Sequence, residues 1–211
     1  MDVLVAGGHG QIARRLLRLL AQRGHTGRGL IRNPDHVADL EADGALPVLC
    51  DLEHDDVRPH IGAADALVFA AGAGPGSGDA RKKTVDLGAA LKLIQAGQEL
   101  GVDRFVMVSA MGLTNIQDGP MRPYLEAKKA ADDALEVSGL AYTIVRPGRL
   151  TNEPGTGSVD LARSLGRSGE IPRDDVAAVL YECLVTDTTV RAGFDLLSGT
   201  TPTGVAVATF S

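Results

Sequence analysis

Short apolar runs and longer amphipathic stretches alternate along the chain from its first residues. The runs show no period-two alternation, which is typical of parallel strands that are covered on both faces. They lie at 2–6, 29–31, 48–50, 66–71, 105–108, 142–145 and 194–197. Between them, apolar residues recur at the spacing of one helical face. In 11–23 these residues are Ile12, Leu16, Leu19 and Leu20.

This alternation predicts the α/β class, with a doubly wound parallel sheet of the Rossmann kind. The 211 residues suffice for one well-buried core and are too few for two comfortable domains, so we expect a single domain over 1–211. A helix is expected to start at 33–35, because proline suits a first helical turn, whereas 205–208 fits a strand or a helix equally well. Ligands of such sheets bind at the carboxyl ends of the strands.

The first predicted strand runs into a glycine-rich turn, Gly7-Gly8-His9-Gly10-Gln11-Ile12-Ala13, which has the pattern G-x-x-G-x-x-A. Gly7 permits the tight turn, Gly10 lets the backbone approach a pyrophosphate, and Ala13 lets the next helix pack closely on the strand. The start of that helix offers unpaired N–H groups and a partial positive charge to the phosphate. The position between strand and helix favours a dinucleotide site over a plain turn. We interpret His9 as an exposed loop residue and not as a catalyst.

The residue that follows the second strand indicates which nicotinamide cofactor is bound. NAD-preferring sites usually carry Asp or Glu there, whereas this chain has Arg32, whose guanidinium can hold a 2′-phosphate. NADP is therefore predicted in preference to NAD, the alternative being a solvated arginine. Asp51 ends the third strand, where it can reach the adenine edge or cap the segment that follows.

Tyr124 and Lys128 are four residues apart on a predicted helix, which places both side chains on one face. An ammonium group beside a phenol favours the phenolate, so the tyrosine can act as a general acid or base. Ser109 ends the fifth strand, where its hydroxyl can polarise a substrate carbonyl. A tyrosine and a lysine at this spacing also arise by chance, but the position after Ser109 favours a catalytic role.

Asp86 lies on the apolar face of a helix that we expect over 80–100, in line with Ala90, Leu93 and Gly97. A carboxylate on such a face must find partners or change its pKa, and such groups cluster at functional sites. The alternative is a carboxylate satisfied by neighbouring backbone.

Two further loops are expected to complete the pocket. Residues 72–78 follow the fourth strand and are rich in glycine, which suits either close approach of a cofactor or a surface loop. Residues 146–151 follow the sixth strand, where backbone groups can hold a nicotinamide amide. Arg149 in that loop is either a ligand of an anionic substrate or an exposed arginine. Residues 149–172 and the C-terminal part are expected to contribute the substrate pocket.

The composition of the chain limits the kinds of partner that we expect it to bind. The formal net charge of −6 and the aromatic content of 3% argue against a nucleic-acid or anionic-membrane surface. No apolar run approaches the roughly 20 residues of a membrane span, and the first residues lack the features of a signal peptide, so we expect a cytoplasmic protein. Cys50 and Cys183 are interpreted as two buried thiols, although a disulfide between them is possible. The oligomeric state stays open, and the expected partner is a small-molecule substrate.

Together these motifs resemble the short-chain dehydrogenase/reductase superfamily, and within it the atypical branch of NAD(P)-binding epimerase-like and NmrA-like proteins. The likeness covers nearly the whole chain and includes the glycine turn, Arg32, 51–52, 70–72, 105–109 and 146–148. The residues expected to contact NADP are Gly7, Gly8, His9, Gly10, Gln11, Ile12, Arg32, Asp51, Leu52, Ala70, Ala71, Gly72, Ser109, Lys128, Pro147, Gly148 and Leu150.

The resemblance also implies a hydride-transfer site of Ser109, Tyr124 and Lys128. Asp86 stands where the superfamily usually has an asparagine, which departs from the usual proton relay. Extended epimerases carry a larger C-terminal substrate domain than this chain offers, so a sugar nucleotide is hard to house. The function expected is reduction by NADPH of a small carbonyl, quinone or similar acceptor. The alternatives are an NADP-binding redox sensor without turnover and a flavin- or tetrapyrrole-type reductase.

Overall fold

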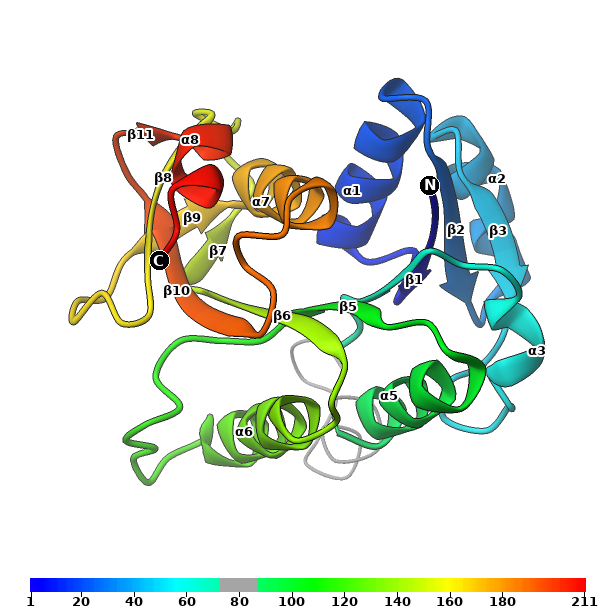
Figure 1. Ribbon diagram of the computed structural model, residues 1–211, viewed down its shortest axis with the longest axis horizontal. Coiled ribbons are helices and arrows are strands. Elements are labelled where there is room, and N and C mark those ends of the chain that lie inside the picture. The colour runs from blue at the N-terminus through cyan, green and yellow to red at the C-terminus, as the bar shows by residue number, and fades with distance from the viewer. Residues whose placement is uncertain (73–86) are drawn as a thin grey trace.

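The computed structural model describes residues 1–72 and 87–211. Residues 73–86 lie outside the described residues, and with them the predicted site residue Asp86 and most of the predicted loop 72–78. The described part of the chain forms a sheet of nine strands with helices on both faces (Figure 1). A second sheet pairs β7 (Arg149–Thr151) with β9 (Glu170–Pro172) in parallel.

The order of the large sheet is β11-β8-β10-β6-β5-β4-β1-β2-β3. From β3 to β10 all neighbours are parallel, whereas β8 runs antiparallel to both β10 and β11. The strands are β1 (Asp2–Ala6), β2 (Thr26–Ile31), β3 (Leu46–Leu49), β4 (Ala66–Phe69), β5 (Arg104–Val108), β6 (Ala141–Pro147), β8 (Ser158–Ala162), β10 (Ala192–Ser198) and β11 (Thr201–Pro202). Strands β2 and β3 are added on one side of β1, and β4, β5 and β6 are added on its other side. The boundary between β1 and β4 is therefore the point where the strand order switches, and a doubly wound fold binds its ligand there. The predicted fold class is therefore confirmed.

Each face of the sheet has its own apolar core. One face packs against α1 (Gln11–Gln22), α2 (Val37–Ala42), α7 (Arg173–Val185) and α8 (Thr203–Ala208). The other packs against α3 (Arg58–Ile61), α5 (Ala89–Leu100) and α6 (Arg122–Glu136). Along β1, for example, Val3 belongs to the first core and Leu4 to the second, so successive side chains fill opposite faces.

Several elements differ from the sequence-based prediction. The third strand is not covered on both faces, because β3 is an edge strand in which Leu46 and Leu49 are 55% and 54% exposed. The undecided segment 205–208 belongs to the helix α8. Helix α7 was not predicted, because it packs against α1, α8 and the sheet at once and therefore carries no polar face on which a periodicity could stand out.

Cys50 and Cys183 are both buried free thiols, as expected. No helix in the described ranges combines the length and the apolar character that a membrane crossing needs.

Candidate functional site

The glycine turn after β1 is shaped by its neighbours. Gly7 has φ +79°, and a Cβ built on it would lie 2.6 Å from the Cα of Ala71, which follows β4. A Cβ on Gly8 would lie 2.7 Å from the Cα of Gly29 in β2. Both positions therefore require glycine, because larger residues would push the turn off the ends of two strands.

The turn leaves the start of α1 open. Gly10 is the N-cap, and no side chain of the described residues caps the helix. The first amides of a helix have no partner within it and point along its positive end. A cradle of glycines before an uncapped helix N-terminus fits a pyrophosphate, so the residues present fit a dinucleotide.

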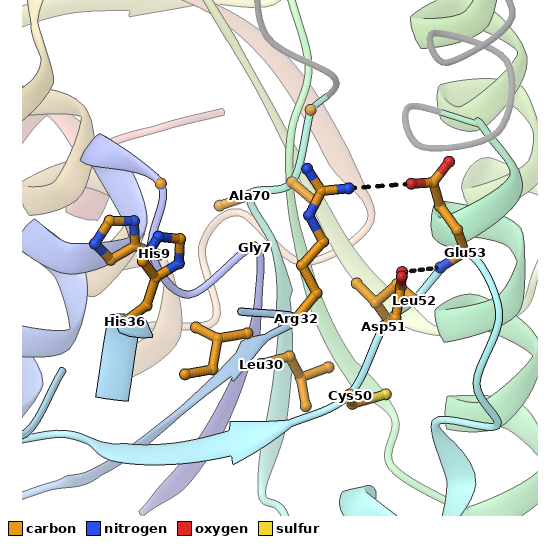
Figure 2. Close-up of a pocket in the computed structure, with 14 residues that line it drawn as sticks. Gly7, His9, Leu30, Arg32, His36, Cys50, Asp51, Leu52, Glu53 and Ala70 are labelled. Carbon is orange, nitrogen blue, oxygen red and sulfur yellow. Dashed lines mark hydrogen bonds and ion pairs between the residues drawn. The ribbon is translucent and has the colours of Figure 1, made fainter. Parts of the chain in front are cut away.

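A cavity of about 370 Å³ lies beside this turn, over the carboxyl ends of β1, β2 and β4 (Figure 2). The predicted cofactor contacts that line it are Gly7, His9, Gly10, Arg32, Asp51, Leu52, Ala70, Ala71 and Gly72. The lining residues that the sequence did not indicate are Leu30, Ile31, His36, Cys50 and Glu53. Among the other predicted contacts, Gly8 and Ile12 are buried and Gln11 is exposed on the first turn of α1.

Arg32 stands in the middle of the cavity wall, where its Nη1 lies 3.4 Å from Oε2 of Glu53 (Figure 2). Its side chain is 55% exposed, so the guanidinium is available to a ligand. Asp51 accepts hydrogen bonds from the Glu53 N–H at 3.0 Å and pairs with His54, so it caps the turn that follows β3. Burial opposes ionisation of Asp51, but these two contacts outweigh it and lower its pKa.

His9 is not the exposed loop residue that the sequence suggested. Its side chain is 31% exposed, and Nε2 lies 2.7 Å from Oδ2 of Asp39 in α2. Its ring also stacks on that of His36, with 3.5 Å between the centroids and 8° between the planes. The pattern gave no sign of this arrangement, because His36 lies in the short 3-10 helix Pro34–His36 after β2, where no periodicity applies.

The second group of predicted residues lies at the end of β5, on the inner face of α6. Lys128 is 4% exposed, and its Nζ donates to the carbonyl of Val108 at 3.1 Å. The same Nζ is 5.8 Å from the centre of the Tyr124 ring and 5.7 Å from that of Phe69, the last residue of β4. Ser109 follows Val108 directly and is buried. The structure thus brings Ser109, Tyr124 and Lys128 to the same end of the sheet as the cavity.

Two charged residues near this group were not predicted as members of the site. Asp132 is 2% exposed, and its Oδ2 accepts from Nε of Arg146 in β6 at 2.8 Å. Burial raises the pKa of Asp132, and the opposing contacts with Ser109 and Arg146 do not cancel it. Asp132 lies one helical turn after Lys128, so the spacing that paired Tyr124 with Lys128 could also have indicated Asp132.

The segment 146–151 is not a loop. Arg146 and Pro147 belong to β6 and Arg149 begins β7. A Cβ on Gly148 would lie 2.4 Å from Cδ2 of Leu197, so this glycine serves close packing against β10. Arg149 pairs with Glu170 and is exposed. Pro147, Gly148 and Leu150 do not line the cavity at the glycine turn; in the sheet, β6 is separated from β1 by β5 and β4.

Comparison with known proteins gives the family. Residues 7–187 match a family described as NAD(P)H-binding. The chain belongs to this family. It is 42% identical to the uncharacterised sugar epimerase YhfK of Bacillus subtilis, over 98% of this chain and 99% of that protein. The resemblance to the atypical short-chain dehydrogenase/reductases is thereby confirmed.

Two solved structures extend the comparison. A protein of Bacillus halodurans, named for the NAD-dependent epimerase/dehydratases, is 40% identical and superposes with a TM-score of 0.95 over 99% of both chains. The oxidoreductase YlbE of Lactococcus lactis is 25% identical with a TM-score of 0.88, over 99% of this chain and 95% of that one. Both the epimerase and the oxidoreductase names thus occur among the similar proteins of this nicotinamide-binding family.

Proposed function

We propose that the protein is an NADP(H)-dependent oxidoreductase that transfers hydride to or from a small carbonyl, quinone or similar acceptor. The observation that carries the proposal is the buried Lys128, held 5.8 Å from the Tyr124 ring at the strand ends that also bear the cofactor cavity. A lysine and a phenol so close together form an acid–base group, and a dinucleotide bound on the glycine turn would extend toward it.

Bound in the cavity, the nicotinamide cofactor would supply or accept the hydride. Tyr124 would donate a proton to the developing alkoxide of the acceptor, and Lys128 would stabilise the phenolate that remains. Ser109 would orient the carbonyl, and Lys128 would also hold a ribose hydroxyl. Residues 149–172 and the C-terminal part would form the wall of the substrate pocket within one domain over 1–211.

NADP is proposed over NAD because the first side chain after β2 is the exposed guanidinium of Arg32. A carboxylate at that point would accept from the ribose hydroxyls, whereas a guanidinium matches the charge and geometry of a 2′-phosphate. The carboxylate of Glu53 lies 3.4 Å from Arg32, on the side of the guanidinium away from His9 and His36 (Figure 2).

An epimerase is the second candidate, and the name of YhfK, at 42% identity, favours it. The same tyrosine could take the proton of a substrate hydroxyl group while the hydride on that carbon passes to the oxidised nicotinamide cofactor. An epimerase returns that hydride to its substrate, so it consumes no cofactor overall. Net oxidation of NADPH therefore distinguishes the two functions.

The test is NADPH oxidation against a panel of carbonyls, quinones and flavins. We expect turnover with at least one acceptor, and a loss of about 10²–10⁴-fold in kcat for Tyr124→Phe, since general acid catalysis contributes that much. Tyr142→Phe is the matched control, because Tyr142 lies near the start of β6, at the other end of the sheet. Full activity of Tyr124→Phe would contradict the proposed role. Tight NADPH binding without turnover across the panel would favour a redox sensor or an epimerase.

A further inference from the structure

We propose that His9 and His36 form a second wall of the 2′-phosphate site, opposite Arg32. The inference rests on the proposed preference for NADP. It assigns the discrimination between NADP and NAD to two residues in addition to Arg32, which follows β2. The cavity is lined by all three side chains, the imidazoles on one side and the guanidinium across from them (Figure 2).

The two imidazoles come from different elements of the chain but stack face to face. His9 lies in the glycine turn and His36 in the 3-10 helix that follows β2, yet their rings stack with centroids 3.5 Å apart. The pair therefore connects the pyrophosphate turn to the segment that would meet the adenosine ribose. A ligand group between Arg32 and the stack would contact both elements at once.

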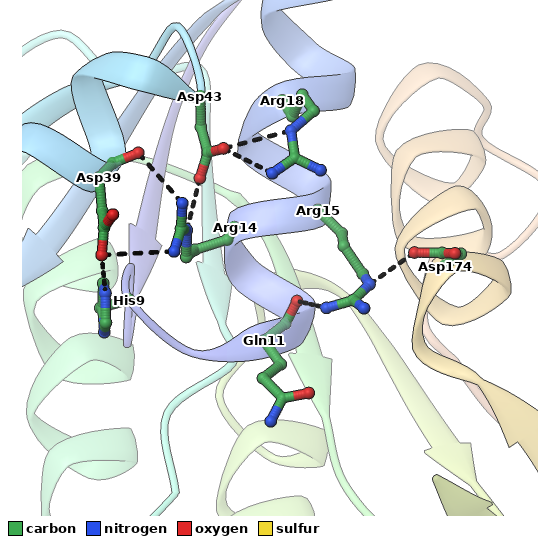
Figure 3. A network of polar contacts seen from close by, with 8 residues as sticks. All are labelled: His9, Gln11, Arg14, Arg15, Arg18, Asp39, Asp43 and Asp174. Atoms are coloured by element: carbon green, nitrogen blue, oxygen red, sulfur yellow. Dashed lines mark hydrogen bonds and ion pairs between the residues drawn. The ribbon is translucent and has the colours of Figure 1, made fainter. Parts of the chain in front are cut away.

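An ion-pair network fixes the orientation of His9 (Figure 3). Oδ2 of Asp39 lies 2.7 Å from Nε2 of His9 and 3.4 Å from Nη1 of Arg14. Arg14 also binds Asp43, which is 5% exposed and bonded to Arg18 as well. The hydrogen bond from His9 and the charge of Arg14 lower the pKa of Asp39, so it is an anion that holds a proton on Nε2.

His36 has no such anchor. Its ring nitrogens make no hydrogen bond to any of the described residues, and its ring is only half-buried. A phosphate dianion favours the charged form of a neighbouring imidazole and accepts its N–H groups. NAD carries a hydroxyl at the same place, so the two histidines would distinguish the cofactors by charge. The charged groups near them are Asp39, Arg14 and Arg32, and the carboxylates of Asp51 and Glu53 line the same cavity. Asp39 is already shared between His9 and Arg14.

The experiment is a titration of the purified protein with four probes: NADP⁺, NAD⁺, adenosine 2′,5′-bisphosphate and adenosine 5′-monophosphate. We expect His36→Ala and His9→Gln to weaken the two 2′-phosphorylated probes about tenfold each, the worth of one lost charge-assisted hydrogen bond. Binding of NAD⁺ and the monophosphate should change by less than about twofold. His9→Gln can keep a hydrogen bond to Asp39, and His60→Ala in α3 is the control outside the cavity.

Three results would overturn the inference, and only the last of them would also overturn the proposed preference for NADP. Equal weakening of NADP⁺ and NAD⁺ would mean that the stack only shapes the turn. A loss of 2′-phosphate discrimination in Arg32→Ala alone, with both histidine variants like wild type, would leave the proposed NADP preference standing without the histidines. A wild-type protein that binds NAD⁺ as tightly as NADP⁺ would overturn the NADP preference and the inference together.

Discussion

Replacing Gly7 by alanine should cost both stability and cofactor binding, and the structure separates the two causes of the stability loss. Gly7 has φ +79°, a conformation that costs an L side chain about 1–2 kcal/mol. The added Cβ would also lie 2.6 Å from the Cα of Ala71, which is backbone and cannot rotate away. Overpacking of this kind costs about 1–3 kcal/mol more. The expected loss for Gly7→Ala is the sum, about 2–5 kcal/mol.

Gly101→Ala is the matched control. Gly101 follows α5 as its C-cap, with φ +71°, and a Cβ there meets no atom within 4 Å, so only the backbone cost of about 1–2 kcal/mol remains. Urea denaturation of the two variants and the wild type gives both values, and NADPH titration gives the affinity. We expect Gly101→Ala to bind NADPH as the wild type does and Gly7→Ala to bind it much more weakly. Equal stability losses together with equal NADPH affinities would refute the account of the turn.

Three further outcomes are expected. Asp132→Ala should destabilise the fold by about 1.5–3 kcal/mol in urea denaturation, because Arg146 loses its buried partner and keeps only the more exposed Glu136, at 3.2 Å. Asp132→Asn should cost less, and a loss below about 1 kcal/mol for the alanine variant would mean that the pair is solvated. Burial raises the pKa of the Cys50 thiol to about 11. In a Cys183→Ala protein, alkylation of Cys50 should therefore be slow at neutral pH, and its rate should rise about tenfold per pH unit up to pH 11. Alkylation of Cys50 as fast as that of an exposed cysteine would contradict this. NADP⁺ should slow the same alkylation, since Cys50 lines the cavity, and an unchanged rate with saturating NADP⁺ would place the cofactor elsewhere.

Patterns along the sequence predict the elements whose environment is uniform. The strands β1, β4 and β5 lie in the middle of the sheet with a core on each face, so their apolar runs carry a clear signal. Edge strand β3 and helix α7 depart from the expected patterns for opposite reasons. β3 exposes Leu49, which the pattern places inside, and α7 buries eight of its thirteen residues, including Asp175, so neither shows the periodicity that its type normally carries.

The residues of the candidate site also fall into two groups, those that local sequence patterns predict and those that they do not. The glycine turn and the pair Tyr124 and Lys128 follow local spacing rules, and the sequence therefore indicated them. The stack of His9 on His36 and the pair of Asp132 with Arg146 join residues 27 and 14 positions apart through tertiary packing, which no local rule describes. Asp132 itself lies four residues after Lys128, so local spacing could have indicated it, whereas its ion pair with Arg146 of β6 could not be predicted in this way.

The proposed function requires that the cavity at the glycine turn and the group of Ser109, Tyr124 and Lys128 form one site. A crystal structure of the complex with NADP⁺ would show whether they do. We expect the pyrophosphate on the glycine turn, the 2′-phosphate at Arg32, and the nicotinamide beside the Tyr124 hydroxyl with Lys128 on its ribose. A nicotinamide that points away from Tyr124, with the phosphates still on the turn, would contradict hydride transfer by these residues.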